Sequence, residues 1–175
     1  MNHVKISTHV LVQAAMMSAI TIVLAQIHLF QLPQGGEISL GTMVPLILLA
    51  RNYGSKITLL AGFICGIIGL LLNPFIYHPV QVLLDYPLPY MAMAIVALFR
   101  GHLYLGVTAA FAIKFLSHFL SGVIFFAAFA PEGMSPILYS ATYNATTLVP
   151  DFFICCLILK LLPLKRLTAE LVTSK

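Results

Sequence analysis

The chain has 175 residues, of which 61% are hydrophobic and only 8% are charged, and its mean hydropathy is +1.02. Soluble domains are about half apolar and a quarter charged, so a water-soluble fold of this length could not bury so much apolar surface. The formal charge of +4 does not indicate nucleic-acid binding, because the basic residues lie between apolar runs, where membrane topology accounts for them.

Apolar runs long enough to cross a bilayer follow one another along the whole chain. A transmembrane helix needs about 20 apolar residues, and fewer when it is buried among other helices. In lipid the backbone polar groups of such runs are best satisfied within helices. We therefore predict an all-α integral membrane bundle of six transmembrane helices in a single domain, residues 1–175. The predicted spans are residues 9–30, 38–51, 54–73, 79–99, 102–127 and 137–162.

The charged residues between these spans predict the orientation of the chain. The connections at residues 31–37, 73–78 and 130–136 contain no Lys or Arg, and two of them carry Glu37 and Glu132. Apart from Lys114, the basic residues all fall at the opposite helix ends. They are Lys5, Arg51, Lys56, Arg100, Lys160, Lys165, Arg166 and Lys175. By the positive-inside rule both termini are predicted to be cytoplasmic, with the acidic connections outside.

A few polar side chains lie inside the predicted spans, where they are costly unless they face a bundle interior or an aqueous cavity. With a rise of about 1.5 Å per residue, Asp85 lies about 9 Å below the outer end of its helix. On the same basis Asn144 lies about 10 Å and His118 about 14 Å below the outer ends of theirs. We expect these three side chains to line one outward-facing pocket, together with the nearby tyrosines Tyr86, Tyr139 and Tyr143.

Each of these side chains also has a structural interpretation. Asp85 can be protonated or bonded to backbone groups that Pro87 and Pro89 free, since proline breaks the helical hydrogen-bond pattern. A buried histidine can be satisfied by its neighbours, and an amide often bonds across membrane helices. Lys114 and Asp151 both lie about 20 Å deep, and for them we favour a structural ion pair over a coupling role.

The pocket's chemistry suits a small, positively charged aromatic ligand. A carboxylate in a low-dielectric site attracts a cation or a heterocycle with hydrogen-bond donors, and the rings of tyrosines and of Phe126 offer stacking and cation–π contacts. No metal-ligand spacing of Cys or His occurs, and the three cysteines lie in apolar segments, so we expect no metal, no cofactor and no disulfide.

The chain has no nucleotide-binding motif, so uphill transport at this length requires an ion gradient or a partner protein. The first span contains Ala15 and Ala19, with Ala14 and Ser18 as a parallel pair. Small residues four apart let another helix approach closely. On spacing alone, docking of a partner and packing within the bundle are equally good interpretations.

Four segments in register resemble the thiamine-specific S component of energy-coupling factor (ECF) transporters. They are "LPQGGEISLGTMVP" (32–45), "HPVQVLLDYPL" (78–88), "KFLSHFLSGVIFF" (114–126) and "YSATYN" (139–144). The resemblance implies a six-helix substrate-binding subunit of a vitamin importer in a bacterial cell membrane. It would dock through Ala15 and Ala19 on a transmembrane coupling subunit carried by two ATPases, with no catalytic residue of its own.

The resemblance also implies which residues bind thiamine. They are Asp85, Tyr86, His118, Gly122, Phe126, Tyr139 and Asn144. Asp85 would pair with the aminopyrimidine ring, and the residues 31–37 would act as a lid, which we call the lid segment.

The chain departs from the family in two ways that keep other ligands open. Some members carry glutamate in place of Asp85, and tryptophans stack the ligand in well-known members, whereas this chain has none. Phe126 takes one tryptophan position and the other falls near Gly36, which leaves a thiamine precursor as an alternative ligand.

Three further alternatives differ more widely in function. The first is an S component for another vitamin, such as riboflavin or biotin. The second is a self-sufficient proton-coupled carrier that uses Asp85, His118 and Lys114 as a relay. An intramembrane enzyme with His118 and Asp85 as acid and base ranks last, because no nucleophile or metal ligand accompanies them.

Overall fold

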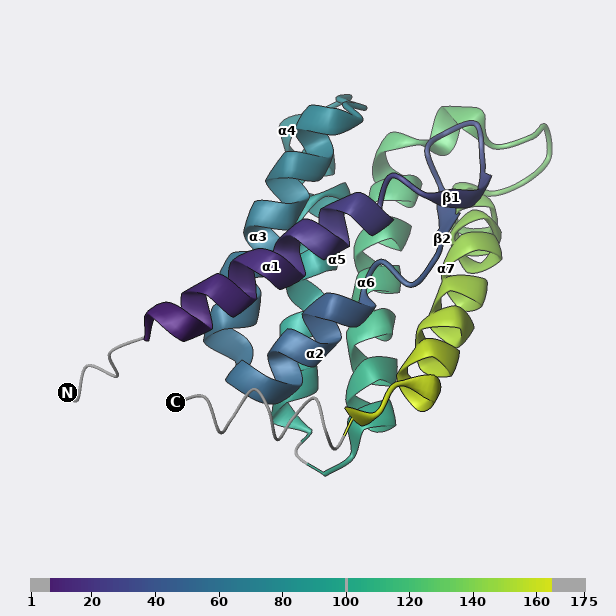
Figure 1. The fold of residues 1–175 in the computed structure, drawn as a ribbon. Helices are drawn as coiled ribbons and strands as arrows, with labels where there is room; N and C mark the ends of the chain where they lie inside the picture. Colours follow the sequence, from purple (N-terminus) through teal and green to yellow (C-terminus); the bar gives the residue numbers. More distant parts are fainter. Residues whose placement is uncertain (1–6, 100, 165–175) are drawn as a thin grey trace.

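The computed structural model describes residues 7–99 and 101–164, and it is built mostly of helices (Figure 1). The α-helices are α1 (Thr8–Leu24), α2 (Val44–Tyr53), α3 (Ser55–Leu72), α4 (Pro79–Asp85), α5 (Pro87–Met91), α6 (Leu103–Phe125) and α7 (Pro136–Leu161). Two 3₁₀-helices, η1 (Ala92–Leu98) and η2 (Ala127–Phe129), and two strands, β1 (His28–Gln31) and β2 (Glu37–Ser39), complete the described elements. The prediction of a fold built mainly of helices is thereby confirmed, whereas the two strands depart from the predicted all-α class.

Four helical segments within the described residues are long and apolar enough to cross a membrane. They are Ser55–Leu72, Pro79–Leu98, Leu103–Phe125 and Pro136–Leu161. Helix α1 is apolar but has 17 residues, and α2 has only 10. The chain is therefore a multi-pass membrane protein by length and composition, whereas the number of six spans stays a prediction.

The connection between α1 and α2 is a β-hairpin, and here the predicted spans 9–30 and 38–51 were wrong at their facing ends. Helix α1 ends at Leu24 and α2 begins only at Val44. Strands β1 and β2 pair antiparallel, with His28 opposite Ser39. The turn between them contains Gly35 at φ 85°, a left-handed backbone conformation that glycine adopts without a steric penalty.

The fourth predicted span, residues 79–99, is broken in its middle. Helix α4 ends at Asp85, and Tyr86 separates it from α5, which begins at Pro87. Because proline cannot continue the hydrogen-bond pattern of the preceding turn, the helix is interrupted beside Asp85. The carbonyl of Leu84 then accepts a hydrogen bond of 2.6 Å from the Ser117 hydroxyl on α6, which satisfies it within the bundle.

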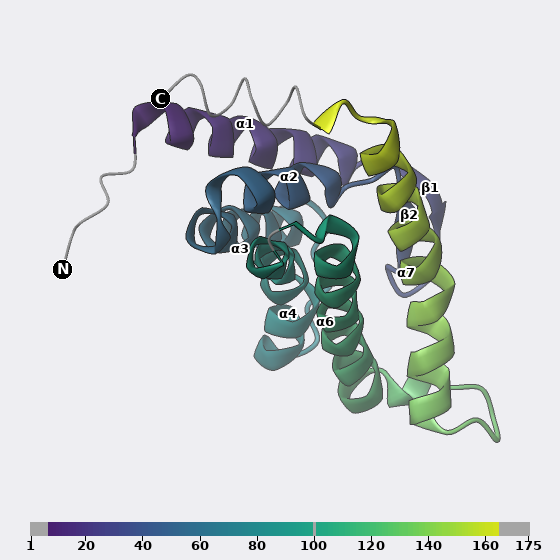
Figure 2. The ribbon, with the colours of Figure 1, turned by 90° about the horizontal axis from the view of Figure 1, so that it is seen from below.

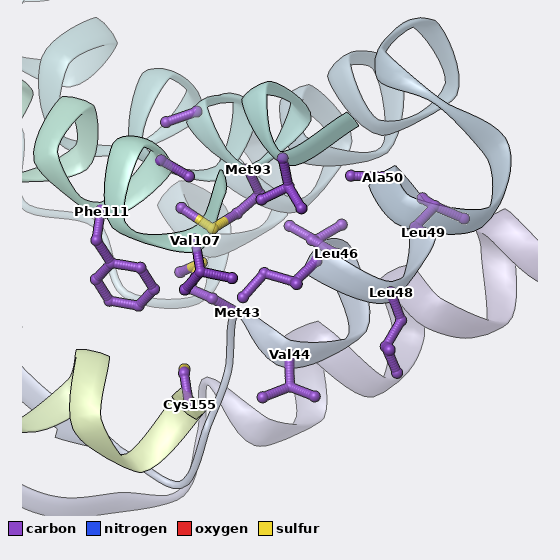
Figure 3. Packing of buried hydrophobic residues seen from close by; sticks show 14 of the residues in the cluster. Met43, Val44, Leu46, Leu48, Leu49, Ala50, Met93, Val107, Phe111 and Cys155 are labelled. Atoms are coloured by element: carbon purple, nitrogen blue, oxygen red, sulfur yellow. The ribbon is translucent and has the colours of Figure 1, made fainter. Parts of the chain in front are cut away.

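Helix α2 lies at the centre of the apolar core. Its residues from Val44 to Ala50 are all buried, and it packs against α1, α3, η1 and α7 (Figure 2). Leu46, Ile47 and Leu49 are fully enclosed, and Figure 3 shows Met93 beside Leu46 and Val107. A helical segment that is apolar on all sides belongs in the interior, so residues 44–50 of α2 are covered by the other helices, whereas Arg51 near its end is exposed.

The two ends of the bundle carry opposite charges. Figure 1 places the hairpin and the start of α4 at one end, with the α2–α3 junction and the end of α7 at the other. Arg51, Lys56 and Lys160 belong to the second end, whereas Glu37 lies in the hairpin at the first end. Lys5, Arg100, Lys165, Arg166 and Lys175 lie outside the described residues. Cytoplasmic termini stay a prediction.

Candidate functional site

A cavity of about 230 Å³ lies at the hairpin end of the bundle. Its walls come from the end of α1, the hairpin, α3, the broken α4–α5 helix, α6 and α7. The residues predicted to bind substrate all line it: Asp85, Tyr86, His118, Gly122, Phe126, Tyr139 and Asn144. The expectation that side chains from separate spans meet in one hollow therefore agrees with the geometry.

Asp85 is the polar centre of one wall of the cavity. Its Oδ2 accepts hydrogen bonds from Gln81 Nε2 at 2.8 Å and from Ser121 Oγ at 2.7 Å. Its Oδ1 lies 3.1 Å from Nδ1 of His118, and because an ionised carboxylate can only accept, His118 is the donor there whenever Asp85 is ionised. Three donors then surround the carboxylate, whose side chain is 19% exposed.

Gln81 holds this carboxylate and the α3–α4 connection at the same time. It is almost fully buried, and its amide nitrogen also donates to the carbonyl of Phe75 at 3.1 Å. Its amide oxygen accepts from the backbone N–H of Tyr77 at 3.0 Å. Sequence reasoning missed Gln81, although its place four residues before Asp85 on a helix was a usable signal. Ser121, three residues after His118, was missed in the same way.

The aromatic part of the wall is held by Tyr86 and Phe126. The Tyr86 hydroxyl donates to the carbonyl of Asn73 and accepts from the N–H of Phe75, both at 2.8 Å. Its hydroxyl is therefore committed to the α3–α4 connection. The rings of Phe75 and Phe126 stack with centroids 5.7 Å apart and an interplanar angle of 25°. Phe75 is a second lining residue that sequence reasoning did not identify.

Gly122, Ser140 and Asn144 form a close contact between α6 and α7. A Cβ atom on Gly122 would collide with the Ser140 hydroxyl, so only glycine fits there without a shift. Asn144 donates to the carbonyl of Ser140 at 2.9 Å, within its own helix. This bond agrees with a structural role for the amide, while the same side chain also borders the cavity.

A buried ion pair joins α6 and α7 at the wall of the cavity, as predicted. Lys114 Nζ lies 3.4 Å from Asp151 Oδ2, and the two side chains are 9% and 3% exposed. The other carboxylate oxygen, Oδ1, accepts a hydrogen bond of 2.7 Å from Ser39 Oγ at the end of β2. The pair therefore ties the hairpin to the helices as well as joining the helices to each other.

The charges around the cavity favour a cation. The described lining residues include three carboxylates, Glu37, Asp85 and Asp151, but only one ammonium group, that of Lys114. Burial raises the pKa of Glu37, and His28 and Lys114 partly oppose this rise. Nδ1 of His28 lies 2.7 Å from Oε2 of Glu37. Since burial disfavours the charged form of a carboxyl group, a bound cation would relieve part of the cost of keeping these groups ionised.

The two pairs of small residues on α1 differ in burial. Ser18 is buried and donates to the carbonyl of Ala14 at 2.8 Å, and Ala14 packs against the core. Ala15 and Ala19 are exposed, beside Met16 and Ile20, which are also exposed. One pair therefore packs within the bundle, whereas the other lies on an apolar outer face, for which docking of a partner stays a prediction.

Comparisons with known proteins agree with one another. The family described as "Thiamine transporter protein (Thia_YuaJ)" matches residues 11–171. "Thiamine transporter ThiT" of Bacillus subtilis (strain 168) is 35% identical over 171 residues, which covers 87% of this chain and 88% of that protein. "Thiamine transporter ThiT" of Lacticaseibacillus paracasei is 26% identical over 122 residues, 58% of this chain and 61% of that protein. A solved structure of ThiT from Listeria monocytogenes shares the fold, with a TM-score of 0.80, 23% identity and coverage of 93% and 96%.

The Lys114–Asp151 pair generates a prediction about stability. Asp151→Asn leaves the Lys114 ammonium group buried without its counter-charge, and breaking a buried pair from one side costs about 3–5 kcal/mol. We expect a clearly lower melting temperature for the ligand-free protein in detergent. The double change Lys114→Met with Asp151→Leu should recover part of that loss, because it removes both buried charges but also the acceptor of the Ser39 hydroxyl.

The matched control is Lys56→Met, which removes an exposed lysine at the start of α3 and should leave the melting temperature almost unchanged. A single Asp151→Asn variant as stable as the wild-type protein would contradict the stabilising role of the pair.

Proposed function

The chain belongs to the thiamine transporter protein family, and on this premise we propose that it is the substrate-binding membrane subunit (S component) of an ECF-type importer. It captures thiamine from outside a bacterial cell, and partner subunits drive the uptake with ATP. Membership in a family of transporters agrees with the expectation that the chain catalyses no reaction. The protein binds its ligand and releases it unchanged.

The observation that carries this proposal is the Asp85 carboxylate, held by donors from Gln81, Ser121 and His118 at the wall of an acidic, aromatic-lined cavity. Thiamine joins an aminopyrimidine, which bears hydrogen-bond donors, to a positively charged thiazolium ring. Asp85 accepts from the aminopyrimidine, with Tyr139, His118 and Asn144 around it. Tyr86 and Phe126 supply ring faces, one of them to the thiazolium, since a cation over an aromatic face is attracted by its quadrupole.

The exposed face of α1 supports docking on a coupling subunit. Ala15 and Ala19 are exposed there, and small side chains allow a partner helix to come close. The chain contains no nucleotide-binding motif, so the energy for uptake comes from the partner's two ATPases. The lid segment borders the cavity through Gln31, Gln34 and Glu37, a position suited to covering bound vitamin.

A thiamine precursor that contains the aminopyrimidine is the second candidate ligand. The chain has no tryptophan, and a phenylalanine face attracts a cation less strongly than tryptophan does. The thiazolium ring therefore contributes less here than in members with tryptophan, while the Asp85 contact to the pyrimidine is unaffected. A binding screen should include both compounds, with riboflavin and biotin as further comparisons.

We predict that Asp85→Asn weakens thiamine binding at least tenfold, or about 1.4 kcal/mol. The amide keeps the shape of the side chain but removes the charge and half of its acceptor capacity. Isothermal titration of the purified protein gives the dissociation constant, and thermal shift gives a second measure. A ligand at 100 times its dissociation constant raises the stability of the wild-type protein by about 2.7 kcal/mol.

The control for this variant is Glu132→Gln, which neutralises an exposed carboxylate that does not line the cavity. It should bind thiamine like the wild-type protein. Unchanged affinity in Asp85→Asn would remove Asp85 from the site.

A second prediction separates docking from binding. Replacing both Ala15 and Ala19 by leucine fills the outer face of α1, so thiamine uptake by liposomes containing the ECF partners and internal ATP should fall at least tenfold. Neither residue lines the cavity, so the dissociation constant of thiamine should stay the same. The matched control is Ala112→Leu, at an exposed alanine of α6.

Uptake by liposomes that contain this chain alone, driven by a pH gradient, would contradict the ECF mechanism and favour a proton-coupled carrier. Unchanged ATP-driven uptake in the double leucine variant would place the docking surface elsewhere.

A further inference from the structure

Tyr143 joins α7 to the lid segment at the wall of the cavity. Its hydroxyl accepts a hydrogen bond of 2.9 Å from the backbone N–H of Gly36. Its ring lies beside that of Tyr139, with centroids 5.8 Å apart, and both residues line the cavity. One side chain thus makes a contact with the lid backbone and also forms part of the aromatic wall.

Gly36 is shaped to receive this tyrosine. A Cβ atom at residue 36 would lie 2.8 Å from Cε1, 2.9 Å from the hydroxyl oxygen and 3.0 Å from Cζ of Tyr143. These separations are shorter than packed atoms tolerate, so any larger residue at position 36 must displace the phenol ring. A side chain on the lid at position 36 and the ring of Tyr143 therefore compete for the same space.

A second contact holds strand β2, which follows the turn of the lid segment, to the same helix. Ser39, at the end of β2, donates to Asp151 on α7 at 2.7 Å. Tyr143 and Asp151 are about 12 Å apart along the helix axis, given the rise of about 1.5 Å per residue. Helix α7 therefore holds residues 36–39 at two points, of which Tyr143 lies nearer to the turn.

We propose that Tyr143 determines how tightly the cavity closes on its ligand: its hydroxyl fastens the lid segment at Gly36, and its ring supplies the aromatic wall on that side. In a chain without tryptophan, the aromatic surface beside the lid comes from α7 and not from the lid itself. This inference rests on the proposed function for the identity of the ligand, thiamine, but the contact with the lid does not depend on it.

The contact between Tyr143 and the lid is tested without any ligand. In Tyr143→Phe the ring stays but the acceptor for the Gly36 N–H is lost, so hydrogen–deuterium exchange of the peptide covering residues 32–37 should become at least fivefold faster. The control is Tyr104→Phe, at an exposed tyrosine on α6, which should leave that exchange unchanged. Unchanged exchange in Tyr143→Phe would overturn the proposed fastening of the lid.

The effect on the ligand is tested by stopped-flow measurement of thiamine dissociation. Tyr143→Phe should dissociate at least threefold faster than the wild-type protein, with a similar melting temperature. Tyr143→Ala, which also removes the ring, should raise the dissociation constant at least tenfold. If neither variant changes thiamine binding, Tyr143 has no part in holding the ligand.

The competition for space predicts a compensating pair of changes. Gly36→Trp alone should weaken thiamine binding, because the indole and the Tyr143 ring cannot both fit. The double variant Gly36→Trp with Tyr143→Ala should bind at least fivefold more tightly than Tyr143→Ala, since the lid then supplies the aromatic face. If the losses of thiamine-binding free energy in the two single variants simply add in the double variant, the idea that one ring can replace the other is overturned. A wild-type protein that fails to bind thiamine refutes the proposed function. The hydrogen–deuterium exchange measurement, which uses no ligand, still decides whether Tyr143 holds the lid segment.

Discussion

The structure depends on one constraint, which is the need to satisfy a carboxylate inside an apolar bundle. Asp85 lies where α4 ends, immediately before the break at Tyr86 and Pro87. Its three donors come from its own helix and from α6, and Gln81 extends the network to the α3–α4 connection. A charged group in a low-dielectric environment is costly without such partners. The hydrogen-bond network that supports Asp85 therefore also forms part of the cavity wall, and the aromatic lining residues lie around it.

Much of the helical fold and of the site could be predicted from sequence, because long apolar runs and rare polar residues are strong signals in a membrane protein. Helical rise alone brought Asp85, His118 and Asn144 to similar depth, and all three border one cavity. The hairpin could not be predicted in the same way, because Ile27, Leu29 and Phe30 extend the apolar character of the first span and no Gly or Pro stands before Pro33. Tyr143 could be identified as an aromatic neighbour of the pocket, but its contact with Gly36 joins residues 107 positions apart. No local sequence pattern predicts a contact between residues so far apart.

Helix α1 shows how burial adds what spacing lacks. The pairs Ala14/Ser18 and Ala15/Ala19 have the same four-residue period, so helical geometry alone treats them alike. In the fold, Ser18 is buried beside α3, where its carbonyl lies 3.7 Å from the Cys65 sulfur, whereas Ala15 and Ala19 are exposed. Under the proposed function, bundle packing and partner docking are therefore not rival explanations of one motif, because each would use a different face of the same helix.

The strength of the two contacts that hold residues 36–39 to α7 bears on where energy must enter transport under the proposed function. The Gly36–Tyr143 contact is a neutral hydrogen bond, which contributes about 0.5–1.5 kcal/mol to stability. The Ser39–Asp151 contact is a hydrogen bond to a charged group, which contributes about 1.5–3 kcal/mol. A gap of a few kcal/mol leaves a minor open state populated at about 0.1–10%. Such a lid opens by thermal motion, so a ligand can enter from its side of the membrane without an energy source. On the proposed function, release on the opposite side has no such route, because α2 and the packed core lie between the cavity and that end of the bundle. The proposed partner subunits would therefore act at release and not at capture.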